Sequence, residues 1–341
     1  MANTIPCDGL TFSLYKDADK MMMYESYYRD GAWDAGQLVP FHPIELSPAA
    51  NILNYGQGIF EGMKAYRTVK GKIVLFRPEK NAQRFVRSSE KLAIPSIGEE
   101  RYLQAVKEVV LANQRFIPDS ADGRCSLYIR PVCIGIEPLL GVRPSREYLF
   151  YVFASPVGPY FEKVGVVRLM VMDVHRAAPN GTGDAKAACN YPVTMRPKVE
   201  AKKQGFDDVL YLDPIHNRFV EEAGAANFFA LMENNVLVTP KLGSILPGIT
   251  RESVIQLARD RFGLEVQERE LDVQEVCERA KECFLTGTGA TITSVESIGW
   301  NGQEYNVNRN DFQLAHRLYD ELLGIQLQKK EDPYGWIVEL T

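Results

Sequence analysis

Residues 155–165, SPVGPYFEKVG, divide this chain, because two prolines and two glycines stand there between segments typical of β-strands. Such a stretch is unsuited to a regular helix or strand, since proline lacks the backbone N–H and glycine favours turns. The 341 residues also exceed what one hydrophobic core usually holds. We therefore predict an N-terminal domain over residues 1–154 and a larger C-terminal domain over residues 168–341. An interdomain loop over residues 155–167 joins them.

The N-terminal half mixes strands with helices. Residues 59–68 and 71–78 read as two strands around a Val-Lys-Gly-Lys turn. Apolar residues recur at helical spacing over 81–94 and 101–116, which predicts two amphipathic helices. CSLYIRPVCIG, from residue 125, and the following EYLFYVFAS are rich in aromatic and β-branched residues and are therefore predicted strands.

The C-terminal half repeats this mixture. NFFALMENNVLVTP, residues 227–240, predicts a hairpin that turns at Glu-Asn-Asn. TRESVIQLARDRFG predicts a helix in which Val254, Leu257 and Ala258 share one face and Gly263 marks the end. Strands and helices in both halves predict an α+β fold of two sheet-containing domains.

Composition and charge exclude several classes of function. Hydrophobic residues make up 45% and charged residues 24%, as in a globular protein, and the net charge is −5. This balance offers nothing for nucleic acid or an anionic membrane surface to hold. No apolar run is long enough for a membrane span, and the N-terminus lacks a signal-peptide pattern, so we predict a cytoplasmic location.

The cysteines and histidines predict neither a disulfide framework nor a metal site. No C-x-x-C pair occurs among the six cysteines, and the four histidines form no H-x-x-x-H pair. Scattered, packed free thiols in a reducing compartment explain the cysteines better. We expect Cys189, three residues after Lys186, to be a packed free thiol as well.

Lys186 stands alone among small residues in GTGDAKAACNYPVT, with no second positive charge until Arg196. One interpretation is an exposed loop lysine, because lysines are rarely buried. The other is a nucleophilic amine, because burial lowers the pKa of a lysine and frees it to form a Schiff base. This segment by itself leaves both open.

Two further segments could hold an anion or a polar ligand. In LPGITRES a helix begins directly after Pro-Gly, so the free N–H groups of Ile249 and Thr250 make a ready anion site. TGTGATITSV gathers glycine and threonine after a strand, but it lacks the glycine pattern and the G-K-[ST] of nucleotide-binding loops. The alternative for the second segment is a tight turn between packed elements.

Glu221 and Glu222 precede an apolar strand, and alternation along a strand turns one of them inward if the other faces solvent. A buried carboxylate needs a cationic partner. The alternative is two solvated glutamates at a strand end. With Lys186 and the anion site, an inward glutamate fits pyridoxal 5′-phosphate (PLP). The lysine would bind its aldehyde, and the glutamate would keep the pyridine nitrogen protonated.

The chain resembles the branched-chain amino acid aminotransferases of the fold-type IV PLP enzymes nearly end to end. The matching segments are NYGQGIFEGMKAYR, LFRPEKNAQRF, SLYIRPVCIGIEPLLGV, SPVGPYF, GDAKAACNYPVT, VEEAGAANFFALM, LPGITRES and TGTGATITSV. The resemblance implies a homodimer with the active site at the interface of two domains. It also implies transfer of the amino group between L-leucine, L-isoleucine or L-valine and 2-oxoglutarate.

The resemblance also implies a role for individual residues. Lys186 would be the Schiff-base lysine and the catalytic acid–base group, Glu222 would face the pyridine nitrogen, and Tyr191 would bond the phenolic oxygen. The groups implied at the cofactor phosphate are Arg84, the amides of Ile249 and Thr250, and Thr288. The groups implied on the substrate side are the backbone of Thr288, Gly289 and Ala290 for the carboxylate, with Tyr55, Phe60, Tyr128, Arg130 and Tyr160 for the side chain.

The chain departs from the family pattern at Ala225, where several relatives carry threonine, so a cofactor hydrogen bond there is in doubt. The turn at 287–292 lacks the C-x-x-C pair of some longer relatives, so no thiol switch is predicted there. Two same-fold alternatives share the lysine and glutamate: a D-amino acid aminotransferase and an aminodeoxychorismate lyase. A PLP-binding regulatory protein without turnover is the alternative from another class.

Overall fold

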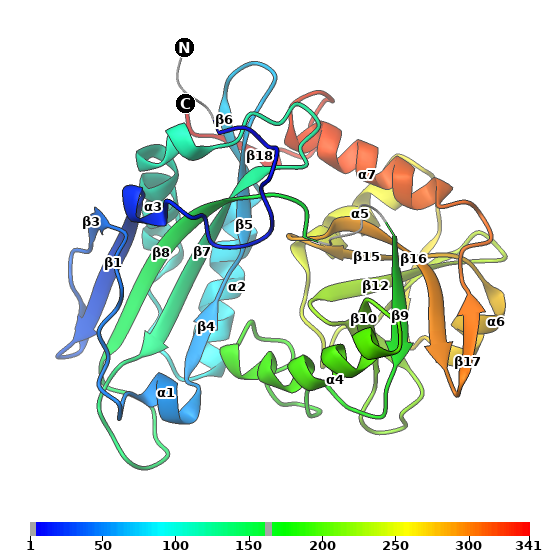
Figure 1. Cartoon of the computed structure of the whole chain (residues 1–341), viewed down its shortest axis with the longest axis horizontal. Coiled ribbons are helices and arrows are strands. Elements are labelled where there is room, and N and C mark those ends of the chain that lie inside the picture. The colour runs from blue at the N-terminus through cyan, green and yellow to red at the C-terminus, as the bar shows by residue number, and fades with distance from the viewer. Residues whose placement is uncertain (1–4, 161–165) are drawn as a thin grey trace. The chain divides into compact units, whose positions relative to one another are not determined.

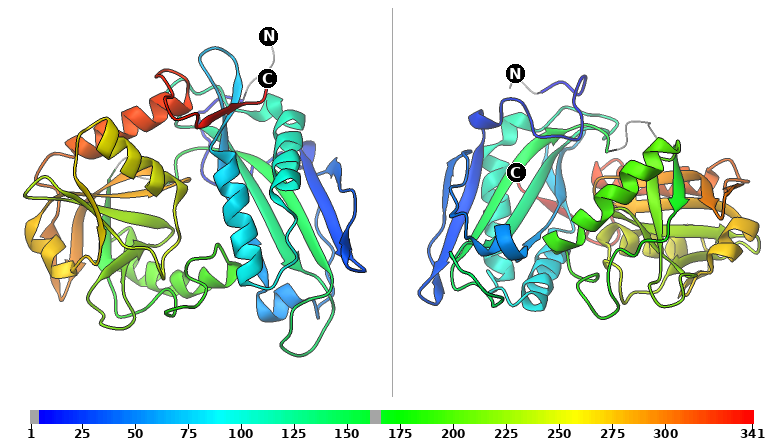
Figure 2. Two further views of the ribbon diagram at one scale, coloured as in Figure 1. Left: turned by 180° about the vertical axis from the view of Figure 1, so that it is seen from behind. Right: turned by 60° about the horizontal axis from the view of Figure 1, so that its bottom comes forward.

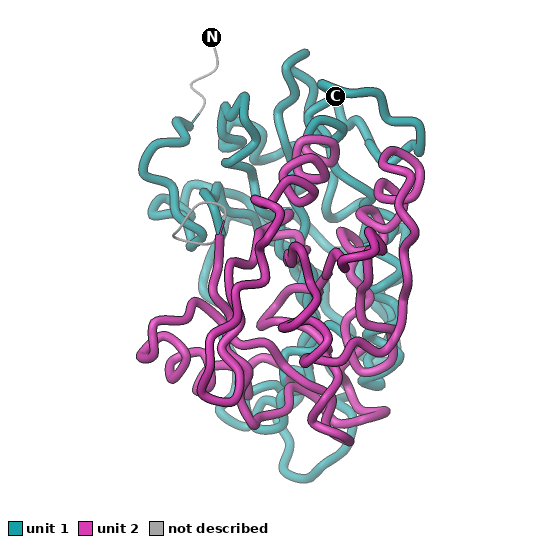
Figure 3. Tube along the Cα trace, turned by 90° about the vertical axis from the view of Figure 1, so that its right-hand side faces the viewer, with its two compact units in different colours: residues 1–160, 185–189, 324–341 teal, residues 161–184, 190–323 magenta. Residues whose placement is uncertain are grey.

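The computed structural model describes residues 5–160 and 166–341 and divides into two compact units (Figure 3). The first unit comprises residues 1–160, 185–189 and 324–341, and the second comprises 161–184 and 190–323. Residues 161–165 of the predicted interdomain loop lie outside the described residues.

The division differs from the predicted boundaries at two places beyond residue 160. The C-terminal residues 324–341 belong to the first unit because strand β18 (Ile337–Glu339) pairs there with β6 (Ile73–Phe76). Residues 185–189 also belong to it, although the chain on either side belongs to the second unit. Assigning all of 168–341 to one domain is therefore wrong, because sequence order does not show where a segment returns to an earlier sheet.

The first unit is built on an antiparallel sheet in the order β18-β6-β5-β7-β8-β1-β2, with β3 on β1 and β4 on β7 (Figure 1). Its other strands are β1 (Met22–Arg29), β2 (Ala32–Trp33), β3 (Gln37–Pro40), β4 (Gly58–Phe60), β5 (Met63–Arg67), β7 (Ser126–Gly135) and β8 (Tyr148–Val157). The predicted strand over 59–68 is broken at Glu61 and Gly62. There the N–H of Glu61 donates to Pro131, and its side chain turns into the interior.

Helices α2 (Pro78–Lys91) and α3 (Glu99–Ala112) lie on one face of this sheet (Figure 2). Their apolar stripes explain the packing, since Phe85 of α2 and Val106 of α3 join the core formed by the strands. A short helix, α1 (Asn51–Tyr55), precedes β4.

The second unit holds a sheet in the order β11-β10-β9-β16-β15-β12-β13-β14, with β17 on β16. Because β11 also pairs with β12, six of these strands close into a ring and leave no open edge between them. The strands are β9 (Val166–Val171), β10 (Asp208–Leu212), β11 (Val220–Ala223), β12 (Ala226–Met232), β13 (Leu237–Pro240), β14 (Val266–Arg269), β15 (Ala280–Gly287), β16 (Thr291–Trp300) and β17 (Gln303–Asn306).

The remaining helices are α4 (Pro192–Lys203), α5 (Ile249–Asp260), α6 (Val273–Arg279) and α7 (Gln313–Gln326). Helix α5 is the one predicted from TRESVIQLARDRFG, and its Val254, Leu257 and Ala258 are fully buried. Two sheets with covering helices confirm the predicted α+β class. Over residues 5–160 and 166–341, no helix is long and apolar enough to cross a bilayer, and no group of three or more His, Cys, Asp or Glu could hold a metal ion.

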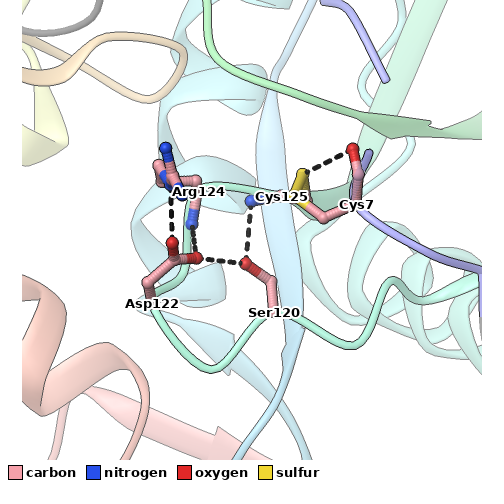
Figure 4. Close-up of a disulfide and its surroundings, with 5 residues drawn as sticks. All are labelled: Cys7, Ser120, Asp122, Arg124 and Cys125. Atoms are coloured by element: carbon pink, nitrogen blue, oxygen red, sulfur yellow. Dashed lines mark hydrogen bonds and ion pairs between the residues drawn. A yellow bond between two sulfur atoms is a disulfide. The ribbon is translucent and has the colours of Figure 1, made fainter. Parts of the chain in front are cut away.

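Cys7 and Cys125 form a disulfide, which corrects the expectation of six free thiols (Figure 4). Their Cα atoms are 5.8 Å apart, a separation typical of disulfides, although 118 positions separate them in sequence. Spacing along the chain could not reveal this pair, because only the path of residues 5–21 brings Cys7 to the start of β7. Cys189 is exposed rather than packed, and Cys133, Cys277 and Cys283 are buried and free.

We expect reduction of this disulfide to lower the free energy of unfolding by about 2–4 kcal/mol, because the bridge restricts the unfolded chain. Urea unfolding with and without dithiothreitol measures the change. The Cys7→Ser/Cys125→Ser double variant should match the reduced protein in both conditions, whereas Cys189→Ser should respond to the reductant as the unchanged protein does. Equal unfolding midpoints with and without reductant would contradict the expectation.

Candidate functional site

The backbone of Lys186 is attached to the first unit at two points. Its N–H donates to Oγ of Ser88 on α2 at 3.0 Å. Its carbonyl accepts the N–H of Phe60 on β4 at 3.1 Å, and Ala187 forms an antiparallel bridge with Ile59. The isolated lysine of the sequence is thus held between a strand and a helix, and it is not a lysine of a free surface loop.

Three of the residues expected on the substrate side lie together with the Lys186 amine in the same unit. Nζ of Lys186 lies 4.9 Å from the centre of the Phe60 ring, and Cζ of Arg130 lies 4.8 Å from the same centre. Arg130 also donates from Nη2 to the hydroxyl of Tyr128 at 3.2 Å. Cations and aromatic faces at these distances attract each other, so the cluster holds its own geometry.

A cavity of about 470 Å³ opens beside Tyr128 and Arg130 in the first unit. Its walls are mostly apolar and include Phe12, Phe41 and Phe153. An apolar cavity with one guanidinium at its wall can accept an aliphatic side chain and can also pair with a carboxylate.

Phe12 is a residue that the sequence reasoning missed. Its ring meets those of Tyr128 and Tyr160 edge to face, with both pairs of ring centres 4.9 Å apart. The N-terminal segment carries no motif that could have pointed to it. Tyr55, which was predicted on the substrate side, is 40% exposed, and its hydroxyl accepts a hydrogen bond from the N–H of Gly141.

Arg84 forms a buried ion pair with Glu61 through two hydrogen bonds. Glu61 is the second residue that the sequence reasoning missed. Nε of Arg84 lies 2.7 Å from Oε1 of Glu61, and Nη2 lies 2.9 Å from Oε2. Asn81 donates to Oε2 at 2.8 Å. Burial raises the pKa of the Glu61 carboxyl, but the charge and hydrogen bonds of Arg84 outweigh it, so this pKa lies below its ordinary value. The charge of Lys186 acts in the same direction. The guanidinium is therefore held in a fixed orientation by an ionised carboxylate.

In the second unit, Glu222 lies on β11 and forms a buried ion pair with Arg176. Arg176 is the cationic partner that an inward glutamate requires. Glu221 is buried too, where it accepts a hydrogen bond from Ser244, and burial raises the pKa of its carboxyl. Both glutamates are buried, so the alternative of two solvated glutamates at a strand end is wrong.

The start of α5 forms the expected set of free amides. Gly248 precedes the helix, and the N–H groups of Ile249 and Thr250 lie in its first turn. Asn227 fixes this loop by donating to the carbonyl of Leu246 at 2.9 Å, and a Cβ at position 248 would collide with its side-chain oxygen. Asn227 also donates to Glu222 at 3.4 Å, so one side chain ties the carboxylate to the anion site.

The other predicted residues of this unit lie in turns or at helix ends. Thr288, Gly289 and Ala290 form the half-buried turn between β15 and β16, where the hydroxyl of Thr293 donates to the carbonyl of Ala290 at 3.1 Å. Tyr191 is half-buried directly before α4. Ala225 occupies the exposed turn between β11 and β12.

Comparison with known proteins places the chain in a family. A family model described as amino-transferase class IV matches residues 58–298. Branched-chain-amino-acid aminotransferase 5, chloroplastic, of Arabidopsis thaliana is 45% identical over 341 residues, which cover 99% of this chain and 80% of the plant protein. The branched-chain-amino-acid aminotransferase of Helicobacter pylori is 42% identical over 316 residues, or 92% of each protein.

A solved structure gives the same result. The branched-chain amino acid aminotransferase from T.th., complexed with N-(5′-phosphopyridoxyl)-L-glutamate, has a TM-score of 0.73 and 28% identity, covering 93% of this chain and 98% of that one. The chain belongs to the class IV aminotransferases. It is an enzyme of fold type IV, and its cofactor is PLP.

The residues of each unit fit this cofactor. The first unit offers an amine for the aldehyde at Lys186 and a fixed guanidinium for the phosphate at Arg84. The second unit offers a buried carboxylate at Glu222 for the pyridine nitrogen and a helix N-terminus for the phosphate.

Proposed function

We propose that this protein transfers the amino group between branched-chain L-amino acids, namely leucine, isoleucine and valine, and 2-oxoglutarate, giving branched 2-oxo acids and L-glutamate. The observation that carries the proposal is the Lys186 amine beside Phe60, in a cluster whose Tyr128 and Arg130 line an apolar cavity. The two relatives reported above are both named as branched-chain-amino-acid aminotransferases, which supports the same substrates.

Bound PLP supplies a ring that accepts the electron pair left when the substrate Cα loses its proton. Nζ of Lys186 would take that proton from Cα and deliver it to the C4′ atom of the cofactor. Glu222 would hold a proton on the pyridine nitrogen, and Tyr191 would donate a hydrogen bond to the phenolic oxygen. Arg84, Thr288 and the amides of Ile249 and Thr250 would hold the phosphate.

The substrate needs two kinds of contact. The backbone of Thr288, Gly289 and Ala290 holds the carboxylate next to Cα. Phe60, Tyr55, Tyr128 and Tyr160 give an apolar surface for a branched side chain. Arg130 pairs with the second carboxylate of glutamate when that substrate takes the place of leucine.

A homodimer is part of this proposal, and light scattering after size-exclusion chromatography measures it. A cytoplasmic location stays a prediction. The cysteines no longer favour it, because Cys7 and Cys125 are paired and disulfides are rare in reducing compartments.

A panel of amino acids tests the function through the visible absorption of bound cofactor. We expect L-leucine, L-isoleucine, L-valine and L-glutamate to bleach the band, and 2-oxoglutarate to restore it. Bleaching by D-alanine but not by L-leucine would favour a D-amino acid aminotransferase. Release of pyruvate from aminodeoxychorismate would favour the lyase, and no response to any of these compounds would favour a regulatory PLP-binding protein.

A further inference from the structure

Ser88 is the one side chain among the described hydrogen bonds that accepts from the Lys186 backbone. It lies on α2, one helical turn after Arg84, and is 1% exposed. The other main-chain contact of Lys186 comes from the Phe60 N–H and cannot be removed by changing a side chain. Ser88 is therefore a point at which substitution can loosen the lysine backbone without altering the lysine itself.

The two contacts define where the lysine side chain begins. Ser88 fixes the peptide before the Lys186 Cα, and Phe60 fixes the carbonyl after it. The lysine side chain extends from this Cα through four rotatable bonds, so a shift of the backbone changes the positions and orientations from which Nζ can reach the substrate. Helix α2 also carries Arg84, a candidate ligand of the phosphate. The residue that holds the Lys186 backbone and this candidate ligand therefore lie on one rigid element.

We propose that Ser88 is a positioning residue for proton transfer, because its hydroxyl holds the Lys186 backbone at the place from which Nζ reaches the substrate Cα. The inference rests on the proposed role of Lys186. A misplacement of about 1 Å at a reacting group can cost on the order of 10²-fold in rate. Removal of the hydroxyl therefore acts on the proton-transfer step and leaves substrate and cofactor binding almost unchanged.

The neighbouring Ser89 is a matched control. It is also 1% exposed and on α2, but its hydroxyl donates to the carbonyl of Phe85 in its own helix, at 2.9 Å. Ser88→Ala and Ser89→Ala thus remove the same group from the same buried helix, and only the first removes a contact with Lys186. Ser88→Thr keeps a hydroxyl at the position.

We expect Ser88→Ala to lower kcat for L-leucine about 10-fold or more and to increase the kinetic isotope effect of α-deuterated leucine. The KM for leucine and the Kd for PLP should change less than about 3-fold, as expected for a positioning effect. Ser89→Ala should leave kcat and the isotope effect near those of the unchanged protein, and Ser88→Thr should restore most of the lost rate.

Hydrogen exchange of the Lys186 amide, measured without substrate, gives a readout that does not depend on turnover. Ser88→Ala should accelerate this exchange, because the amide loses its acceptor, and Ser89→Ala should not. Equal exchange and equal kcat in the two alanine variants would overturn the role of Ser88. Sustained turnover by Lys186→Ala would instead overturn the proposed function, so the two failures are distinguishable.

Discussion

Lys186→Ala should lose transamination of L-leucine by about 10⁴-fold or more, because the variant lacks both the nucleophile and the base that moves the Cα proton. The structure gives this amine a defined environment at 4.9 Å from the Phe60 ring. The backbone contacts of residue 186 do not involve the side chain, so the folded structure should persist. Steady-state formation of L-glutamate measures the loss, and the thermal unfolding midpoint checks the fold.

Two controls separate the chemistry of the amine from its charge. Lys186→Arg keeps a cation near Phe60 but provides no usable base, and it should be as inactive as the alanine variant. Added ethylamine should return part of the activity to Lys186→Ala and none to Lys186→Arg, because the alanine variant leaves space for the amine. Multiple turnovers by Lys186→Ala above one hundredth of the normal rate would refute the assignment.

Breaking the Glu61–Arg84 pair on one side should be strongly destabilising. Arg84→Met leaves the buried Glu61 carboxylate without its counter-charge, and such a change costs about 3–5 kcal/mol. Glu61→Gln likewise leaves the buried Arg84 guanidinium without its counter-charge. The Glu61→Gln/Arg84→Met double variant contains neither charge, so we expect it to recover most of the stability lost by either single variant.

The double variant also separates stability from cofactor binding. If Arg84 holds the phosphate, the double variant should bind PLP at least about 10-fold more weakly than the unchanged protein despite its recovered stability. Its affinity for pyridoxal, which has no phosphate, should change little. Urea unfolding measures the stability, and quenching of tryptophan fluorescence by PLP measures the affinity for the cofactor. Normal affinity for PLP in the double variant would refute the phosphate role of Arg84.

An exposed ion pair of the same unit serves as the control for stability. Lys20 and Asp17 lie 2.9 Å apart with side chains 60% and 34% exposed, so Lys20→Met should lower the free energy of unfolding far less than Arg84→Met does. The stability contributed by the Glu61–Arg84 pair should also depend on pH. The pKa of Glu61 lies below its ordinary 4.5, so its contribution is complete above pH 4.5 and declines as the pH falls through the lowered pKa.

Features encoded over a few residues could be predicted from the sequence. Helix α5 begins at Ile249, where Pro-Gly and the apolar spacing indicate a start, and its amides lie where an anion site was expected. The strands around residues 126–157 follow their aromatic and β-branched runs. These features depend on propensity and periodicity, which act between neighbours in the chain.

The partners of these groups could not be predicted, because they lie far away in the sequence. Arg176 and Glu222 meet through β11 and the loop after β9, and the disulfide joins Cys7 to the start of β7. A pattern of residue types does not specify the spatial distance between such segments. Only strand pairing and helix packing set that distance.

The sequence by itself determined the family and the α+β class, and it predicted the lysine, the glutamate and the helix N-terminus as site groups, because these depend on local motifs in a fixed order. Only the tertiary structure decided which other residues contact these groups. It brought residues 185–189 into the first unit, where Ser88 and Phe60 fix Lys186, and it buried Glu61 against Arg84. The physical reason is that buried charges and amides must find partners, and the closure of the sheets, not the spacing along the chain, determines which partners are within reach.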